Sequence, residues 1–189
     1  MSKDEIREID AKINLPVANK PDSQEICFVS NNDYASFIKD YTGKELPQGN
    51  FVTVDGEVVG RHKGITHYTV GQRRGLNLAL GYPVFVVEIR PETNEVVVGG
   101  GEDVFSDRLY ADRLNFMTIE DLEGEMVVDA KIRYSHKGSK CTIRKISDDV
   151  VECIFDEPQR AITPGQAVVF YDGDYVVGGG TIIGQNKPQ

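Results

Sequence analysis

Cysteine is scarce in this chain of 189 residues, which has three cysteines and no CxxC pair. An odd and sparse set of thiols argues against a disulfide-stapled scaffold and favours a reducing environment. No apolar run approaches the length needed to cross a bilayer, and the N-terminal sequence MSKDEIREID is too charged for a signal peptide. We therefore expect a soluble, cytoplasmic protein with no membrane partner.

The common motifs for nucleotide binding and hydrolysis are also missing. The sequence has no GxxxxGK[ST] loop, no GxGxxG after a predicted strand and no recognisable Ser/His/Asp set. His62 and His67 are five residues apart but have no carboxylate or thiol nearby, so we expect no metal site. We expect no cofactor to bind within this chain, which does not look able to activate a substrate alone.

The charge of the chain is acidic overall but unevenly distributed. The net charge is −9, yet residues 61–80 contain four Lys or Arg and no acid, and residues 130–145 contain six and no acid. Because salt screens charges beyond about 8–10 Å, local patches matter more for binding than the total. The two basic stretches are compatible with a polyanion-binding surface or with an ordinary solvated face.

Two short helices are expected near the N-terminus. Ser2 and Glu5 have the spacing of a capping box, and the apolar stripe that follows predicts a helix ending before Pro16. A helix so close to the start, with nothing before it to pack on, suggests a truncated chain. The second helix is predicted at 33–41, with Asn32 or Asp33 as its cap and Gly43 as its end.

The rest of the sequence predicts β-structure. Runs at 51–54 and 57–60 flank an Asp-Gly turn, and runs at 84–89 and 95–98 form a second hairpin. Further strand-like runs, at the spacing of a small antiparallel barrel or sandwich, lie at 126–134, 141–146, 150–155, 167–171 and 175–183.

The predicted fold class is therefore mainly β (α+β): a short helical lead-in, a mixed β central domain and a small C-terminal antiparallel β-barrel. The domain boundaries that we expect are 1–32, 33–108 and 109–189.

Three stretches could support chemistry or binding, and each has a plainer interpretation. Cys27, in DSQEICFV, is either an exposed thiolate or a buried filler residue. Residues 62–76, HKGITHYTVGQRRGL, form either a phosphate-tracking loop or a basic exposed turn. Residues 131–140, KIRYSHKGSK, form either a basic RNA-binding strand and loop or a solvated surface.

The sequences KPDSQEICFV, HKGITHYTVGQRRGL, AKIRYSHKG and PGQAVVFYDGDYVVGGGTI together resemble the C-terminal half of tRNA-specific 2-thiouridylases. The resemblance implies an enzyme that replaces the oxygen on carbon 2 of the tRNA wobble uridine with sulfur. It also implies an N-terminal ATP-pyrophosphatase domain, absent here, where ATP and Mg²⁺ act. This chain is then expected to be inactive alone.

The resemblance also assigns roles to residues. Cys27 aligns with the cysteine that carries the persulfide, which a second cysteine in the missing domain resolves as a disulfide. The expected partners are the anticodon region of tRNA and a persulfide sulfur-donor protein. The expected tRNA contacts are Lys63, His67, Gln72, Arg73, Arg74, Arg133, His136 and Lys137. The alternative is a non-catalytic RNA-binding β module in which Cys27 is structural.

Overall fold

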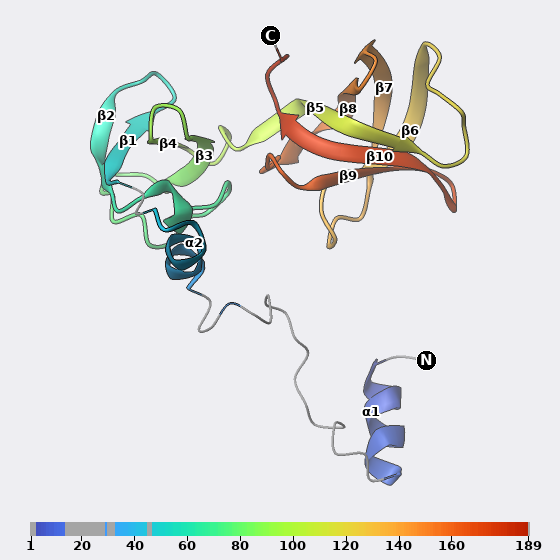
Figure 1. The fold of residues 1–189 in the computed structure, drawn as a ribbon, viewed down its shortest axis with the longest axis horizontal. Coiled ribbons are helices and arrows are strands. Elements are labelled where there is room, and N and C mark those ends of the chain that lie inside the picture. The colour runs from blue at the N-terminus through green and yellow to red at the C-terminus, as the bar shows by residue number, and fades with distance from the viewer. Residues whose placement is uncertain (1–2, 14–28, 30–32, 45–46, 189) are drawn as a thin grey trace. The chain divides into compact units, whose positions relative to one another are not determined.

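The computed structural model describes residues 3–13, 29, 33–44 and 47–188 (Figure 1). Its chain divides into two parts, 1–45 and 46–189, which we describe separately. Cys27, with the rest of DSQEIC, lies outside the described residues. The predicted domain boundaries therefore stay predictions.

The N-terminal part contains two helices, α1 at Lys3–Lys12 and α2 at Tyr34–Thr42. The cap of α2 is Asp33, whose carboxylate accepts a hydrogen bond from the Ser36 backbone N–H at 3.1 Å. Gly43 ends the helix in the left-handed conformation, with its N–H donating to the Lys39 carbonyl. Both predicted helices are confirmed, and neither described helix is long and apolar enough to span a membrane.

A four-stranded mixed sheet begins the second part. Its order is β2-β1-β4-β3, with parallel pairing between β1 and β4 and antiparallel pairing elsewhere. The strands are β1 at Gly49–Thr53, β2 at Val58–His62, β3 at Phe85–Arg90 and β4 at Glu95–Gly99. Both predicted hairpins are confirmed. Phe51, Val86 and Val96 are buried between the sheet and the loop that follows β2.

The remaining strands close into a six-stranded antiparallel barrel with the order β10-β5-β8-β7-β6-β9. Closure leaves no free sheet edge. The strands are β5 at Phe105–Phe116, β6 at Glu125–Lys131, β7 at Ser139–Ser147, β8 at Val150–Arg160, β9 at Ala167–Asp172 and β10 at Tyr175–Gly184. The predicted mainly β fold with a C-terminal barrel is confirmed.

Strand β5 was not predicted, because its sequence does not alternate. Leu109, Tyr110 and Ala111 are buried in succession, whereas a half-buried strand normally buries every second residue. The pairing of β5 also shifts register against both β8 and β10, and Arg113 has a φ of +51°. Such irregularities let one long strand curve around a small barrel, and they remove the period-two signal.

One carboxylate in the barrel wall holds three strands together. Glu152 on β8 has a side chain only 3% exposed, and it accepts hydrogen bonds from Tyr110 and Arg108 on β5 at 2.7 and 2.8 Å. Arg144 on β7 donates to its other oxygen at 2.6 Å. Burial opposes ionisation of Glu152, but these hydrogen bonds and the two guanidinium charges outweigh it and lower its pKa.

Replacing this carboxylate should weaken the barrel. We expect Glu152→Gln to lower the free energy of unfolding by about 1–3 kcal/mol, because the acceptor loses its negative charge and an amide N–H₂ replaces one of the two accepting oxygens. Glu125→Gln is the matched control, since Glu125 is 60% exposed and lies 3.5 Å from the same Arg144. The control should change stability by less than about 0.5 kcal/mol in urea unfolding.

The same variant should alter the response to acid. A lowered folded-state pKa means that the network stabilises the protein fully above the unfolded carboxyl pKa of about 4.3. This contribution to stability is lost as the pH falls through the pKa of Glu152 in the folded protein. Between about pH 5 and pH 3 the unmodified protein should therefore lose more stability than Glu152→Gln. If stability falls equally with pH in the unmodified protein and in Glu152→Gln, protonation of Glu152 is not the cause of the acid sensitivity.

Candidate nucleic-acid interface

The predicted stretch 62–76 starts with a histidine that belongs to the core. His62 is 2% exposed and packs edge-on against Phe51 and Tyr68. Its Nδ1 accepts a hydrogen bond from the Gly64 N–H, so its Nε2–H donates to the Asn94 carbonyl at 3.1 Å. Burial lowers the pKa of His62, against the opposing effect of the Asn94 hydrogen bond. This histidine is a neutral structural residue.

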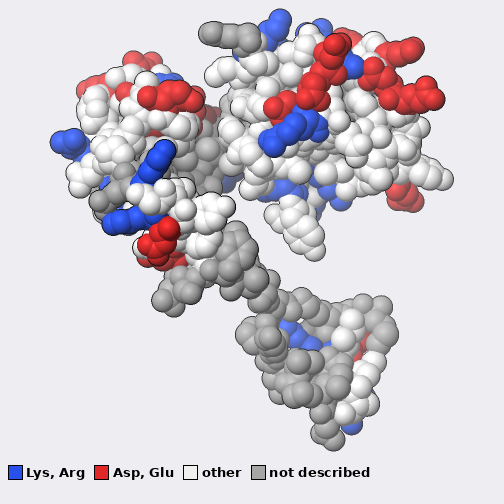
Figure 2. Space-filling view, in the orientation of Figure 1, with Lys and Arg blue, Asp and Glu red and all other residues white. Residues whose placement is uncertain are grey.

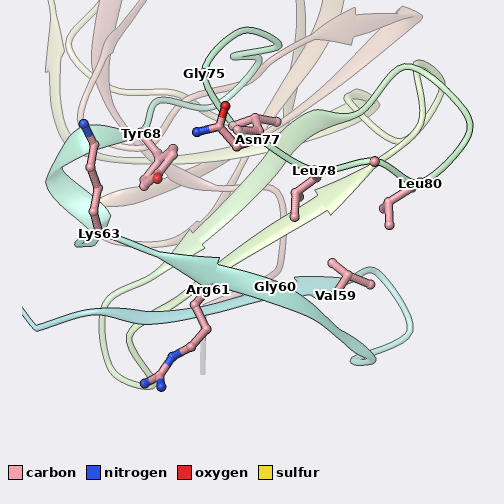
Figure 3. A pocket seen from close by; sticks show the side chains of 11 residues that line it. Val59, Gly60, Arg61, Lys63, Tyr68, Gly75, Asn77, Leu78 and Leu80 are labelled. Atoms are coloured by element: carbon pink, nitrogen blue, oxygen red, sulfur yellow. The ribbon is translucent and has the colours of Figure 1, made fainter.

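Lys63 and His67 lie close to His62 in sequence but face solvent. His67 ends a single 3₁₀ turn, Ile65–His67, and Lys63 lies at the rim of a hollow of about 380 Å³. Figure 3 shows Lys63 and Leu78 on opposite sides of this hollow, with Tyr68 between them. A cation beside an apolar wall is compatible with the predicted RNA contact of Lys63, which stays a prediction.

Loop 69–74 is held in one shape by its own hydrogen bonds and by strand β3. The Gly71 N–H donates to the Val86 carbonyl at 2.7 Å, and the Val86 N–H donates back to the Gln72 carbonyl at 2.9 Å. The Gln72 side chain accepts from the Thr69 N–H at 3.0 Å and donates to the Arg74 carbonyl at 2.9 Å. Gln72 therefore shapes the loop, and its predicted contact with RNA remains untested.

Arg73 and Arg74 project from this loop into solvent. The guanidinium carbon of Arg73 lies 6.0 Å from the ring centroid of Phe85, the first residue of β3. Stacking on a ring limits the rotamers of an arginine without neutralising its charge. The loop thus presents two cations on a braced backbone.

The second predicted stretch lies at the β6–β7 turn of the barrel. Arg133, Tyr134 and Lys137 are exposed, Tyr134 fully so. His136 is partly buried, and its Nδ1 is buried without a hydrogen-bond partner among the described residues. The side chain of Arg133 donates to the Arg160 backbone carbonyl at 2.9 Å. The turn is therefore tied to the end of β8.

Arg160 is a site residue that sequence reasoning missed. Its guanidinium carbon lies 5.5 Å from the ring centroid of Phe85, the same ring on which Arg73 stacks. Arg160 therefore links the loop of the sheet with the turn of the barrel. In the sequence it stands alone after Asp156 and Glu157, so no local charge signal marks it.

The ion pairs separate the arginines into two groups. Within the described part of the chain, Arg90, Arg108, Arg113 and Arg144 each pair with a carboxylate. The other described arginines, at 7, 61, 73, 74, 133 and 160, form no ion pair with any described residue. Figure 2 shows acidic and basic side chains lying next to one another at several places on the face in view. Unpaired, exposed and partly ordered guanidinium groups suit phosphate recognition.

Family models match three consecutive stretches of the chain. A tRNA methyl transferase HUP domain matches residues 1–31, a tRNA methyl transferase PRC-barrel domain matches 35–100, and an aminomethyltransferase beta-barrel domain matches 106–182. The second and third matches cover the mixed sheet and the six-stranded barrel described above.

Relatives with curated names match nearly the whole chain. A tRNA-specific 2-thiouridylase MnmA from Lachnoclostridium phytofermentans is 67% identical over 96% of this chain, and one from Carboxydothermus hydrogenoformans is 52% identical over 96%. A third, from Clostridioides difficile, is 51% identical over 95%. The chain spans about half the length of these relatives. The identity to these relatives is high and extends across all three matched stretches. We therefore follow the name of the relatives, which is more specific than the domain descriptions.

The bracing role of Gln72 can be tested by hydrogen exchange. Gln72→Ala should speed exchange of the Thr69 amide by about five- to tenfold, because that N–H loses its side-chain acceptor. Gln48→Ala is the control, since Gln48 is exposed and offers only its backbone carbonyl to Asn94. Unchanged exchange at Thr69 would mean that the loop keeps its shape without the Gln72 amide.

Proposed function

Because the chain belongs to the tRNA-specific 2-thiouridylase family, we propose that it takes part in converting a tRNA wobble uridine to 2-thiouridine. In this proposal the part at 46–189 binds the tRNA in its anticodon region, and Cys27 carries the incoming sulfur as a persulfide. The observation that carries the tRNA-binding role is that four arginines without carboxylate partners lie on segments that contact one another: Arg73 and Arg74 on loop 69–74, Arg133 in the β6–β7 turn and Arg160 at the end of β8.

The proposed RNA surface is supported by both geometry and charge. Loop 69–74 is held by reciprocal hydrogen bonds with Val86. Its backbone is therefore already ordered, and RNA binding to its arginines loses less conformational entropy. Contacts of arginine with phosphate position an RNA without reading its sequence. We therefore assign these arginines to the backbone of the tRNA rather than to its bases.

The assignment of Cys27 is supported by the state of the other two thiols. Cys141 on β7 and Cys153 on β8 are free, fully buried and directed into the barrel core. Burial, with the neighbouring Cys141, raises the pKa of the Cys153 thiol well above its ordinary value. A sulfur-transferring cysteine must ionise and be reached by its donor and substrate, so neither barrel thiol fits that role. Cys27 is the remaining cysteine of the chain.

We place the ATP and Mg²⁺ of the proposed reaction outside the described residues. These contain no group of three or more His, Cys, Asp or Glu side chains arranged to hold a metal, and the sequence has no phosphate-binding loop. We propose that activation of the uridine by ATP belongs to the half of the relatives that this chain does not match. These 189 residues alone should then bind tRNA but produce no 2-thiouridine.

Substitution of Cys27 in the complete enzyme tests the sulfur-carrying role. We expect Cys27→Ser to reduce wobble 2-thiouridine by at least about a hundredfold, because a hydroxyl cannot carry a persulfide. The readout is nucleoside mass spectrometry of tRNA after reaction with a sulfur donor. Cys153→Ala is the control and should retain thiolation, since it removes only a buried thiol. Full activity of Cys27→Ser would favour the alternative, an RNA-binding module with a structural cysteine.

Loss of charge from loop 69–74 tests the RNA surface. Arg73→Gln combined with Arg74→Gln should weaken tRNA binding and reduce the slope of log affinity against log salt by about 2, roughly one per lost phosphate contact. Arg113→Gln with Lys187→Gln removes the same charge from other exposed positions. Equal slopes for the two double variants would show that the loop makes no specific contact with the tRNA.

A further inference from the structure

Two arginines from different structural elements share one aromatic ring. Arg73 belongs to the loop before β3, Arg160 ends β8 of the barrel, and their guanidinium carbons lie 6.0 and 5.5 Å from the Phe85 centroid. A ring attracts a cation by about 0.5–1 kcal/mol at an exposed site. Two like charges near one ring also repel each other. The meeting of Arg73 and Arg160 at Phe85 therefore contributes little to the stability of the fold, and stability alone does not explain it.

The backbone around Arg160 is fixed from several sides. Its carbonyl accepts the hydrogen bond from Arg133, and the next residue, Ala161, donates its N–H to the Val104 carbonyl at 2.7 Å. Gly71 approaches closely as well: a Cβ added there would lie 2.8 Å from the Ala161 Cβ and 3.6 Å from Arg160 Nη1. Because Gly71 also has a φ of +85°, the close approach and the backbone conformation both require glycine. The two arginines are thus brought together by packing.

We propose that Arg160, Arg73 and Phe85 form one phosphate-binding site that joins the mixed sheet to the barrel and takes the sugar–phosphate backbone of RNA. The inference rests on the proposed tRNA-binding function and adds Arg160 as a binding residue. Both guanidinium groups lack a carboxylate partner among the described residues, so each keeps its hydrogen-bond donors available. Phe85 restricts their rotamers and so lowers the entropy lost on binding.

This site would fix the register of the RNA on both β-structures at once. An anionic strand that contacts only the loop can pivot about it, whereas one held by Arg73 and Arg160 is constrained by both the sheet and the barrel. Arg133 acts as a positioning residue here, because its donated hydrogen bond ends on the Arg160 carbonyl.

The test is tRNA binding by the complete enzyme across a range of salt concentrations. Arg160→Gln should weaken binding by about three- to tenfold and lower the salt slope by about 1. Phe85→Leu should weaken binding while leaving the slope unchanged, because it removes the ordering ring but no charge. Arg113→Gln is the matched single-charge control. A slope for Arg160→Gln equal to that of the control would overturn the inference.

A double-mutant cycle tests whether the two arginines act together. Arg73→Gln and Arg160→Gln should be non-additive, with the double variant losing less affinity than the product of the two single losses. Additive losses would show two separate contacts and overturn the shared site.

Failure of this inference can be separated from failure of the proposed function. If Arg73 and Arg74 matter but Arg160 does not, the shared site is wrong and the RNA surface stands. If none of the three arginines affects binding, the proposed surface itself is wrong. Thermal unfolding of each variant checks that the fold is retained, and 2-thiouridine formation by the same variants reports the enzyme activity independently.

Discussion

The reciprocal hydrogen bonds between Val86 and loop 69–74 are the constraint on which the candidate site depends. Val86 is fully buried in β3, and its N–H and carbonyl are both used by the loop. This pairing extends the sheet by one irregular segment and sets where Gly71 meets Ala161. Without it, Arg73 and Arg74 would extend from an unrestrained loop, and ordering them on binding would cost about 1–2 kcal/mol per residue. The site is therefore an extension of the core rather than an independent surface feature.

The carboxylates of the described residues pair with some of the cations and leave others unpaired. Glu152 and Glu125 hold Arg144, and Asp121 holds Lys145, so acids of the barrel pair with these two cations of β7. No described carboxylate approaches Arg73, Arg74, Arg133 or Arg160 closely enough to form an ion pair. A net charge of −9 is consequently compatible with a basic surface, since the field near a bound strand is set by neighbouring charges.

Local signals predicted most of the fold. The Asp33 cap and Gly43 end of α2 confirm the sequence prediction, and so do the hairpin around Asp55 and Gly56 and five of the six barrel strands. Each of these features depends on residues that are close in the sequence. Strand β5 was missed because its three successive buried residues and its register shifts follow from barrel closure, which no local pattern encodes.

The candidate site was less predictable for the same reason. The exposure of Arg73 and Arg74 agrees with a solvent-facing loop, but the side-chain hydrogen bonds of Gln72 and the stacking of Arg160 depend on tertiary contacts. Arg160 reaches Phe85 only because β8 pairs with β5 and ends beside the loop. Phe85 and Arg160 lie 75 positions apart in the sequence, and the charges near Arg160 are acidic. Sequence reasoning therefore identified the basic stretches but not the residue that joins them.

The arginines and Cys27 would contribute to the proposed reaction in different ways. Contacts with phosphates distant from the reacting carbon are the same before and during sulfur transfer, so they lower the substrate concentration required without lowering the chemical barrier. A persulfide on Cys27 would instead take part in bond formation and act on the chemical step itself. A surface that fixes the register of the tRNA can still accelerate the reaction, because holding the uridine near the sulfur replaces a bimolecular encounter with an oriented one. That contribution requires rigidity, which the pairing at Val86 and the contact between Gly71 and Ala161 provide.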